Sequence, residues 1–323
     1  LLGTGIFLSV TGKAQSNKTA VHKLLIRPVD KDSSFNLQPL GLQTTFSNKD
    51  GCMAYISRLV GLLHSKGYPT ASVDSVFENE SFTSIHLFLG KKYLWIKLKT
   101  DSIEKLALDN SRYRQKDYDG KLLNIPQLIG LQQKILNYYE NNGYPFEQVY
   151  LDSIKLIEEK MEAVLKTIKG PLYHIDSIRI LGKGKISKNF LQHYLGIANG
   201  SLYNSKKLQA VSKRMQDLPY LQDLKQSDIT MLGTGAMLNL YLAPKRSSQA
   251  NFLIRFLPSA NQSGKLQLTA DVNLDLKNAL SNGETILLKW QQLQPKSPRL
   301  NVGFQQPYIF KTNFGIDFLF DLF

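Results

Sequence analysis

The chain has 323 residues, of which 42% are hydrophobic and 20% are charged, so it can form several folded cores and is neither fibrous nor of low complexity. It carries 40 Lys and Arg against 26 Asp and Glu, and the net charge of +14 suggests an anionic partner. The single cysteine, Cys52, excludes an internal disulfide framework and a cysteine-rich metal site. No run of about 18 apolar residues occurs, which excludes a membrane-spanning helix.

The first fifteen residues have the composition of an export signal. Residues 1–10 are mainly apolar, and the small residues Gly12 and Ala14 precede Gln15 as at a signal-peptidase site. We therefore expect residues 1–15 to be a signal peptide that lacks its start, followed by a mature chain outside the cytoplasm. The alternative is a buried N-terminal strand.

An internal repeat organises the next part of the chain. Gly67-Tyr68-Pro69 recurs 76 residues later as Gly143-Tyr144-Pro145. An amphipathic helical pattern precedes each triplet, with Ser47 or Asn48 as the first N-cap and Asn124 as the second. Glycine allows the left-handed end of a helix and proline prevents its continuation, so each triplet should end a helix.

Strand patterns flank these helices and divide the chain into three units, 20–91, 92–170 and 171–245. The pattern predicts three strands in each unit, at residues 23–29, 71–78 and 83–89, at 93–99, 148–158 and 161–168, and at 173–181, 224–231 and 236–242. Each unit has the order strand, helix, helix, strand, strand, although the first helix is poorly defined in the first two units. In the third, Ser187 should begin a short helix and one further helix should extend from Leu208 to Leu218.

The pattern changes in residues 246–323. Apolar and polar residues alternate without error from Lys265 to Leu276, and similar alternation predicts four further strands. Aromatic residues such as Trp290 on the apolar face favour membrane-spanning β-strands, while a soluble β-sandwich is the alternative. Because five strands cannot close a barrel and open edges are not tolerated in lipid, we expect the chain to be a fragment whose remaining barrel strands are missing.

These motifs together resemble the BamA/TamA family of outer-membrane assembly factors. The repeated units with a Gly-Tyr-Pro helix end resemble POTRA domains. Residues 269–284 resemble the opening barrel hairpin of the family, with Ser281 where a glycine is common, and Gln306-Pro307-Tyr308 is similar to a later element. The resemblance implies α+β POTRA-like repeats (β-α-α-β-β) followed by antiparallel transmembrane β-barrel strands of an incomplete barrel. It also implies an outer-membrane location with the repeats in the periplasm.

The resemblance further implies a factor for the assembly, insertion or translocation of outer-membrane proteins rather than an enzyme. Its partners would be unfolded outer-membrane proteins, periplasmic or lipoprotein accessory subunits and outer-membrane lipids, but not nucleic acid. Neither the five histidines nor Cys52 has the spacing of a metal or catalytic site, so we expect no cofactor and no metal.

Two kinds of partner-binding strand are expected. In the repeats, an incoming segment would add to a free sheet edge, unless neighbouring elements cover that edge. By resemblance, this edge is the strand after Gly-Tyr-Pro. The edge residues are Ser72, Val73, Asp74, Ser75 and Val76 in the first unit, and Val149, Tyr150, Leu151, Asp152, Ser153 and Ile154 in the second. By resemblance, the first barrel strand would form one side of a lateral gate, and its residues are Phe252, Leu253, Ile254, Arg255 and Phe256.

The excess positive charge is distributed over separate segments, with +7 on residues 171–246. No block of five or six like charges occurs, which is the pattern of a solvated surface. We therefore expect the basic third unit to lie near anionic groups at the membrane surface. A soluble periplasmic binding scaffold with a C-terminal β-sandwich remains the alternative, and a nucleic-acid binder is disfavoured because no aromatic-basic motif is present.

Overall fold

The computed structural model describes residues 21–32, 34–233, 235–258, 266–294, 297–310 and 312–322. The expected signal peptide, residues 1–15, lies outside the described residues. The chain forms two compact units, residues 1–134 with 150–166 and residues 135–149 with 167–323. Within the described residues, no helix is both long and apolar enough to cross a bilayer.

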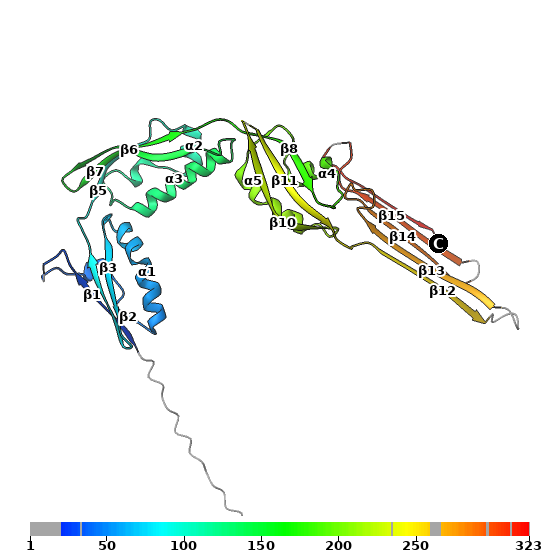
Figure 1. Ribbon diagram of the computed structural model, residues 1–323, viewed down its shortest axis with the longest axis horizontal. Coiled ribbons are helices and arrows are strands. Elements are labelled where there is room, and N and C mark those ends of the chain that lie inside the picture. Colours follow the sequence, from blue (N-terminus) through cyan, green and yellow to red (C-terminus); the bar gives the residue numbers. More distant parts are fainter. Residues whose placement is uncertain are drawn as a thin grey trace, which may run out of the picture. The chain divides into compact units, whose positions relative to one another are not determined.

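The first repeat (20–91) is a four-stranded mixed sheet with a helix against one face (Figure 1). The strands have the order β2-β1-β4-β3, and β1 runs parallel to β4. Where the sequence predicted a poorly defined first helix, the chain forms only a short 3-10 turn. The elements are β1 (His22–Pro28), η1 (Gln38–Leu40), β2 (Thr45–Phe46), α1 (Lys49–Ser65), β3 (Ser72–Glu78) and β4 (Phe82–Phe88).

Helix α1 begins and packs as its sequence predicts. The Oδ1 atom of Asn48 accepts a hydrogen bond from the Gly51 N–H at 2.8 Å, which identifies Asn48 as the N-cap. The apolar stripe of α1 is buried in one core with Ile85 and Leu87 of β4. Cys52 belongs to this stripe and is completely buried, and burial raises the pKa of its thiol.

The second repeat (92–170) contains a three-stranded sheet of order β5-β7-β6, in which β5 runs parallel to β7. The Asn124 side chain accepts a hydrogen bond from the Gln127 N–H at 3.0 Å, as expected for the N-cap of the following helix. The elements are β5 (Leu94–Lys99), α2 (Lys105–Ser111), η2 (Gln115–Asp117), α3 (Ile125–Glu140), β6 (Gln148–Ile157) and β7 (Lys160–Ile168).

The third repeat (171–245) has the sheet order β10-β11-β8-β9, with β11 parallel to β8. Ser187 caps α4, as predicted, by accepting the Phe190 N–H at 3.1 Å. The single helix predicted from Leu208 to Leu218 is instead two short helices that meet at Ala210. The elements are β8 (His174–Leu181), α4 (Lys188–Leu195), β9 (Ser201–Leu202), α5 (Ser205–Gln209), α6 (Val211–Gln216), β10 (Leu221–Leu232) and β11 (Gly235–Pro244).

The same hydrogen bond links each Gly-Tyr-Pro triplet to the first strand segment of the following repeat. Gly67 and Gly143 have φ angles of 91° and 97°, the left-handed geometry expected at a helix end. The Gly67 carbonyl accepts the Tyr93 N–H at 2.7 Å, and the Gly143 carbonyl accepts the Tyr173 N–H at 2.7 Å. Each triplet therefore both ends a helix and fixes the start of the next repeat.

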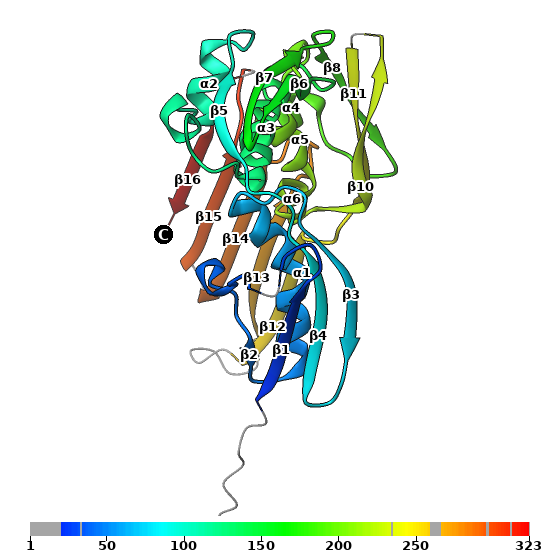
Figure 2. The same ribbon diagram turned by 90° about the vertical axis from the view of Figure 1, so that its left-hand side faces the viewer.

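Residues 249–322 form a five-stranded antiparallel sheet, here named the C-terminal sheet, in which the strands lie side by side in chain order (Figure 2). Five strands are what the alternating sequence predicted. They are β12 (Gln249–Pro258), β13 (Leu266–Lys277), β14 (Thr285–Gln294), β15 (Ser297–Gln306) and β16 (Ile316–Leu322).

The strand register places most of the apolar residues of the five strands on one face, whereas Leu253, Leu287 and Leu319 lie on the other. A row across the sheet pairs Phe252 with Val272, Val272 with Trp290, Trp290 with Leu300 and Leu300 with Leu322. The adjacent row points to the opposite face of the sheet and is polar. It consists of Asn251, Asn273, Lys289, Asn301 and Asp321. No second sheet packs against the apolar face within the described residues.

Candidate functional site

Strand β3, which contains the predicted partner-binding residues 72–76, lies at the edge of its sheet. It pairs with β4 alone, so its other side has unpaired backbone groups. The register shifts between Val73 and Ser75, and Asp74 accordingly has no partner in the ladder. The Asp74 carboxylate accepts a hydrogen bond from the Ser72 hydroxyl at 2.8 Å.

Strand β6, which contains predicted residues 149–154, is also an edge strand. Its backbone is interrupted at Ser153, which has a positive φ of 51° and donates its N–H to the Asp152 carboxylate at 2.7 Å. The Asp152 carboxylate also pairs with Lys166 of β7, and this contact holds the pKa of Asp152 below its usual range. Beyond the interruption, Ile154, Leu156 and Ile157 are exposed.

The two edges therefore share one design, with an irregularity at the Asp-Ser pair of the repeated sequence. Irregular edges protect a sheet from uncontrolled pairing because a long straight strand cannot follow them.

The edge of the third repeat was missed by sequence reasoning. Strand β10 occupies the same outer position as β3 and β6, and its register shifts twice, between Asp223 and Lys225 and between Lys225 and Asp228. The sequence signal was available, because Pro219-Tyr220 precedes β10 where Gly-Tyr-Pro precedes the other edge strands. A groove of about 250 Å³ follows this strand, lined by residues that include Tyr203 and Leu208.

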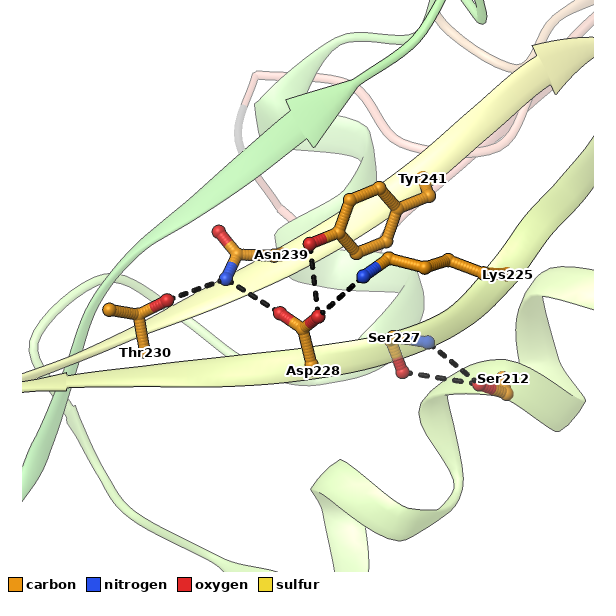
Figure 3. A network of polar contacts seen from close by, with 7 residues as sticks. All are labelled: Ser212, Lys225, Ser227, Asp228, Thr230, Asn239 and Tyr241. Carbon is orange, nitrogen blue, oxygen red and sulfur yellow. Dashed lines mark hydrogen bonds and ion pairs between the residues drawn. The ribbon is translucent and has the colours of Figure 1, made fainter.

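A polar network holds β10 against β11 at the second shift (Figure 3). The Asp228 carboxylate accepts hydrogen bonds from Asn239 at 2.8 Å, from the Tyr241 hydroxyl at 2.9 Å and from Lys225 at 3.1 Å. These contacts, with that from Asn239 the largest, lower the pKa of Asp228. Lys225 also lies 3.8 Å from the centre of the Tyr241 ring. On the other side of β10, Ser227 bonds Ser212 of α6 at 3.1 Å (Figure 3).

The predicted gate residues, 252–256, lie on β12 at one edge of the C-terminal sheet. This strand pairs only with β13, and its outer side is unpaired. Phe252, Ile254 and Phe256 alternate on the apolar face and are 64% to 67% exposed. Leu253 and Arg255 point to the opposite face.

The turn between β13 and β14 contacts the third repeat. Glu284 is completely buried and its carboxylate accepts the N–H groups of Leu280 and of Asn282, the latter at 3.0 Å. The turn is attached to the start of α4 by the Ser187 N–H, which donates to the Ser281 carbonyl at 2.7 Å. The Gly283 backbone lies directly against the Phe190 ring.

A later segment completes this contact. The Tyr308 ring lies 5.4 Å from the Phe190 ring and 5.5 Å from the His193 ring, measured between centroids. Both segments that resembled family motifs in the sequence thus contact one helix of the third repeat.

Side chains suited to catalysis or metal binding are scattered in the described part of the chain. There, no group of three or more His, Cys, Asp or Glu residues could hold a metal ion. His22 bonds the Thr83 hydroxyl at 2.9 Å, and His86 bonds the Ser75 hydroxyl at 2.9 Å, so both serve strand packing.

The first three sheets define the class of domain. Two of them are four-stranded mixed sheets built from one repeat each, with the first strand central and parallel to the last. Residues 173–237 match the family model described as "POTRA: Surface antigen variable number repeat". This match lies within the third repeat, and it confirms the predicted POTRA resemblance there.

Comparisons with solved structures give matches of low identity. BamA from Haemophilus ducreyi lacking POTRA domains 1–3 is 14% identical over 68% of this chain, with a TM-score of 0.45. POTRA3–5 of BamA from Haemophilus influenzae is 12% identical over 69% of this chain and 96% of that one, with a TM-score of 0.46. CdiB from Acinetobacter baumannii is 14% identical over 67% of this chain, with a TM-score of 0.39. The chain spans 41% of the Haemophilus ducreyi structure and 42% of the CdiB structure. No curated protein matches.

Proposed function

We propose that the chain belongs to an outer-membrane protein of the BamA/TamA type, which assembles, inserts or translocates other outer-membrane proteins. In this proposal the three repeats lie in the periplasm and the C-terminal sheet forms the first strands of a membrane β-barrel. The unfolded chains of outer-membrane proteins are the substrates, and accessory subunits assist.

The observation that carries this proposal is the register of the C-terminal sheet. A transmembrane β-strand needs about 9 to 11 residues. Strands β12, β14 and β15 have 10 residues each, and β13 has 12. Apolar side chains from all five strands share one face, with Trp290 and Phe252 in one row. Water would oppose the exposure of such a face, whereas lipid would stabilise it.

Substrate binding is proposed at the three strand edges. Backbone N–H and C=O groups on β3, β6 and β10 would pair with an extended segment, which requires little sequence specificity. The exposed apolar residues Phe77 and Ile154, next to the irregularities, would contact alternate side chains of that segment.

The unpaired side of β12 supports the proposal of a gate. An open strand edge in lipid has unsatisfied backbone groups, so it must pair with a further strand of the same barrel or of a substrate. Residues 252–256 would then form one side of the seam through which substrate strands enter the bilayer.

The membrane proposal is tested by the two tryptophans of the chain, Trp95 and Trp290. Trp95 is 2% exposed in the second repeat, whereas Trp290 lies on the apolar face of β14. In vesicles that contain brominated phospholipids, we expect quenching of the wild-type emission and none in Trp290→Phe, which retains only Trp95. Unquenched Trp290 emission in vesicle-bound protein would favour the soluble scaffold with a C-terminal sandwich.

The strand-edge proposal is tested by photocrosslinking to an unfolded outer-membrane barrel protein diluted from urea. A benzophenone amino acid replaces Phe77 or Ile154 on the edges, and Ile129 on α3 serves as the control. These side chains are 56%, 53% and 57% exposed, so differences in crosslinking do not arise from exposure. We expect crosslinks from the two edge positions only, and equal crosslinking from Ile129 would contradict strand addition.

A further inference from the structure

The strongest unassigned feature is a cationic cavity of about 510 Å³ where the third repeat meets the C-terminal sheet. This volume is within the range of small-molecule sites, about 300 to 1,000 Å³. Five cationic residues line it, and its lining contains no carboxylate. They are Lys183, Lys185, Lys245, Arg246 and Lys277.

The cations come from three separate segments. Lys183 and Lys185 lie in the loop between β8 and α4, Lys245 and Arg246 lie between β11 and β12, and Lys277 ends β13. Their convergence is a product of the fold, since residues 185 and 277 are far apart in the chain.

Hydrogen bonds that involve the backbone hold the three segments together. The Gly184 N–H donates to the Leu242 carbonyl at 2.8 Å, and the Asn278 side-chain amide donates to the Lys185 carbonyl at 2.9 Å. The Lys277 N–H donates to the Ser248 hydroxyl at 3.0 Å. The cavity is therefore formed by segments attached to one another, although Lys183, Lys185 and Lys245 on it are exposed.

Four of the five positive charges of the cavity are not neutralised by an ion pair within the described residues. Among the described residues, Lys183, Lys185, Lys245 and Arg246 have no carboxylate within 4.0 Å, and the Lys277 ammonium is 3.9 Å from the Asp275 carboxylate. Like charges gathered around a recess produce a positive potential that an anion relieves. Lysine and arginine side chains suit a phosphate group.

We propose that this cavity binds the phosphate of an anionic lipid headgroup. The lipid source follows from the position of the cavity at the start of β12, because the exposed apolar residues of that strand begin at Phe252, a few residues after Arg246. A lipid whose phosphate occupies the cavity would extend its acyl chains along this apolar face. This step rests on the proposed membrane location of the C-terminal sheet.

Direct binding measurements test the site without any assembly assay. The chain in dodecylmaltoside micelles is titrated calorimetrically with dihexanoyl phosphatidylglycerol, with dihexanoyl phosphatidylcholine and with inorganic phosphate. We expect the phosphatidylglycerol to bind more tightly than the other two. Binding of inorganic phosphate as tight as that of phosphatidylglycerol would assign the site to free phosphate and overturn the lipid proposal.

The variant K183Q/K185Q/K245Q removes three charges from the cavity, and K188Q/K206Q/K213Q removes three exposed charges of the same repeat outside it. At about a fivefold loss of affinity per lysine, the cavity variant should bind phosphatidylglycerol roughly 100-fold more weakly, and the control should retain its affinity.

Equal losses in both variants would show a diffuse surface effect, and no loss in either would show that the cavity is not used; both results would overturn the proposal. Trp290 quenching is measured on the same variants. Loss of quenching in the wild type would contradict the membrane location, whereas normal quenching with no preference for phosphatidylglycerol would contradict the cavity site alone.

Discussion

The contact between the β13–β14 turn and α4 depends on the absence of a side chain at Gly283. Its φ is +75°, and a Cβ atom added there would lie 2.1 Å from Cε2 of Phe190. Phe190 cannot easily move away, because it is 3% exposed in the core of the third repeat and stacks on Tyr194 at 5.4 Å. Gly283→Ala should therefore detach the turn from the helix.

The expected cost has two parts. The left-handed backbone costs about 1 kcal/mol for alanine relative to glycine. Overpacking against the Phe190 ring adds about 1 to 3 kcal/mol. The sum of about 2 to 4 kcal/mol is limited by the free energy of docking, because the turn can detach instead of accepting the strain.

Hydrogen exchange at the Ser187 amide measures this docking, since its N–H bonds the Ser281 carbonyl at 2.7 Å. Gly200→Ala is the matched control, because Gly200 has a φ of +77° and an added Cβ would meet nothing within 4 Å. The overpacking part of the cost, about 1 to 3 kcal/mol, corresponds to a factor of roughly 5 to 150 at 1.4 kcal/mol per factor of ten. Protection of the Ser187 amide from exchange should therefore be lower by this factor in Gly283→Ala than in the control. Equal protection in the two variants would refute the role assigned to Phe190.

Three further predictions concern stability. The pKa of Asp228 is lowered, chiefly by its hydrogen bond with Asn239, so Asp228 stabilises the fold above its usual pKa of about 4. This stabilisation is lost as the pH falls through the pKa of the folded state. The free energy of unfolding of Asp228→Asn, measured with denaturant, should therefore depend less on acid pH than that of the wild type. Burial raises the pKa of Tyr118 to about 12, so Tyr118 stabilises the fold below pH 10 and this stabilisation is lost as the pH rises towards 12. Tyr118→Phe should reduce the alkaline loss of unfolding free energy. An unchanged dependence of the unfolding free energy on pH would contradict this role of Tyr118. Replacement of either N-cap, Asn48 or Asn124, by alanine should cost about 1 kcal/mol in thermal unfolding, whereas aspartate should retain most of the stability.

Local chemistry made most elements predictable from the sequence. Asn48, Asn124 and Ser187 are helix caps in the structure because their side chains satisfy N–H groups within three residues. Strict alternation likewise predicted the five strands of the C-terminal sheet. The division of the helix after Leu208 was not predictable in this way, because its apolar spacing continues through the break at Ala210.

The candidate sites were less predictable because they depend on contacts between distant residues. Edge strands follow from sheet order. The family resemblance predicted that residues 72–76 and 149–154 lie on edges, but β10 was missed because the triplet is altered there. The cationic cavity had no sequence signal of its own. Its lysines are single or paired in three segments and become a cluster only when the segments pack together.

The repeated triplet shows how one sequence motif can have a local and a distant role. The left-handed glycine ends its helix through bonds with nearby residues, and this role is evident from the sequence. The same glycine also accepts an N–H from Tyr93 or Tyr173, and both bonds measure 2.7 Å.

A Cβ at Gly143 would lie 2.5 Å from Cδ1 of Leu172, in the segment that leads into the next repeat. Glycine is therefore needed twice at this position, for its φ and for the close approach of the next repeat. In the third repeat Pro219-Tyr220 stands in place of the triplet. The Tyr220 carbonyl accepts the Lys245 N–H at 2.9 Å, which attaches the segment leading to the C-terminal sheet. One kind of backbone contact thus recurs at each exit from a repeat, and at the last it positions Lys245, one of the lysines that line the cationic cavity.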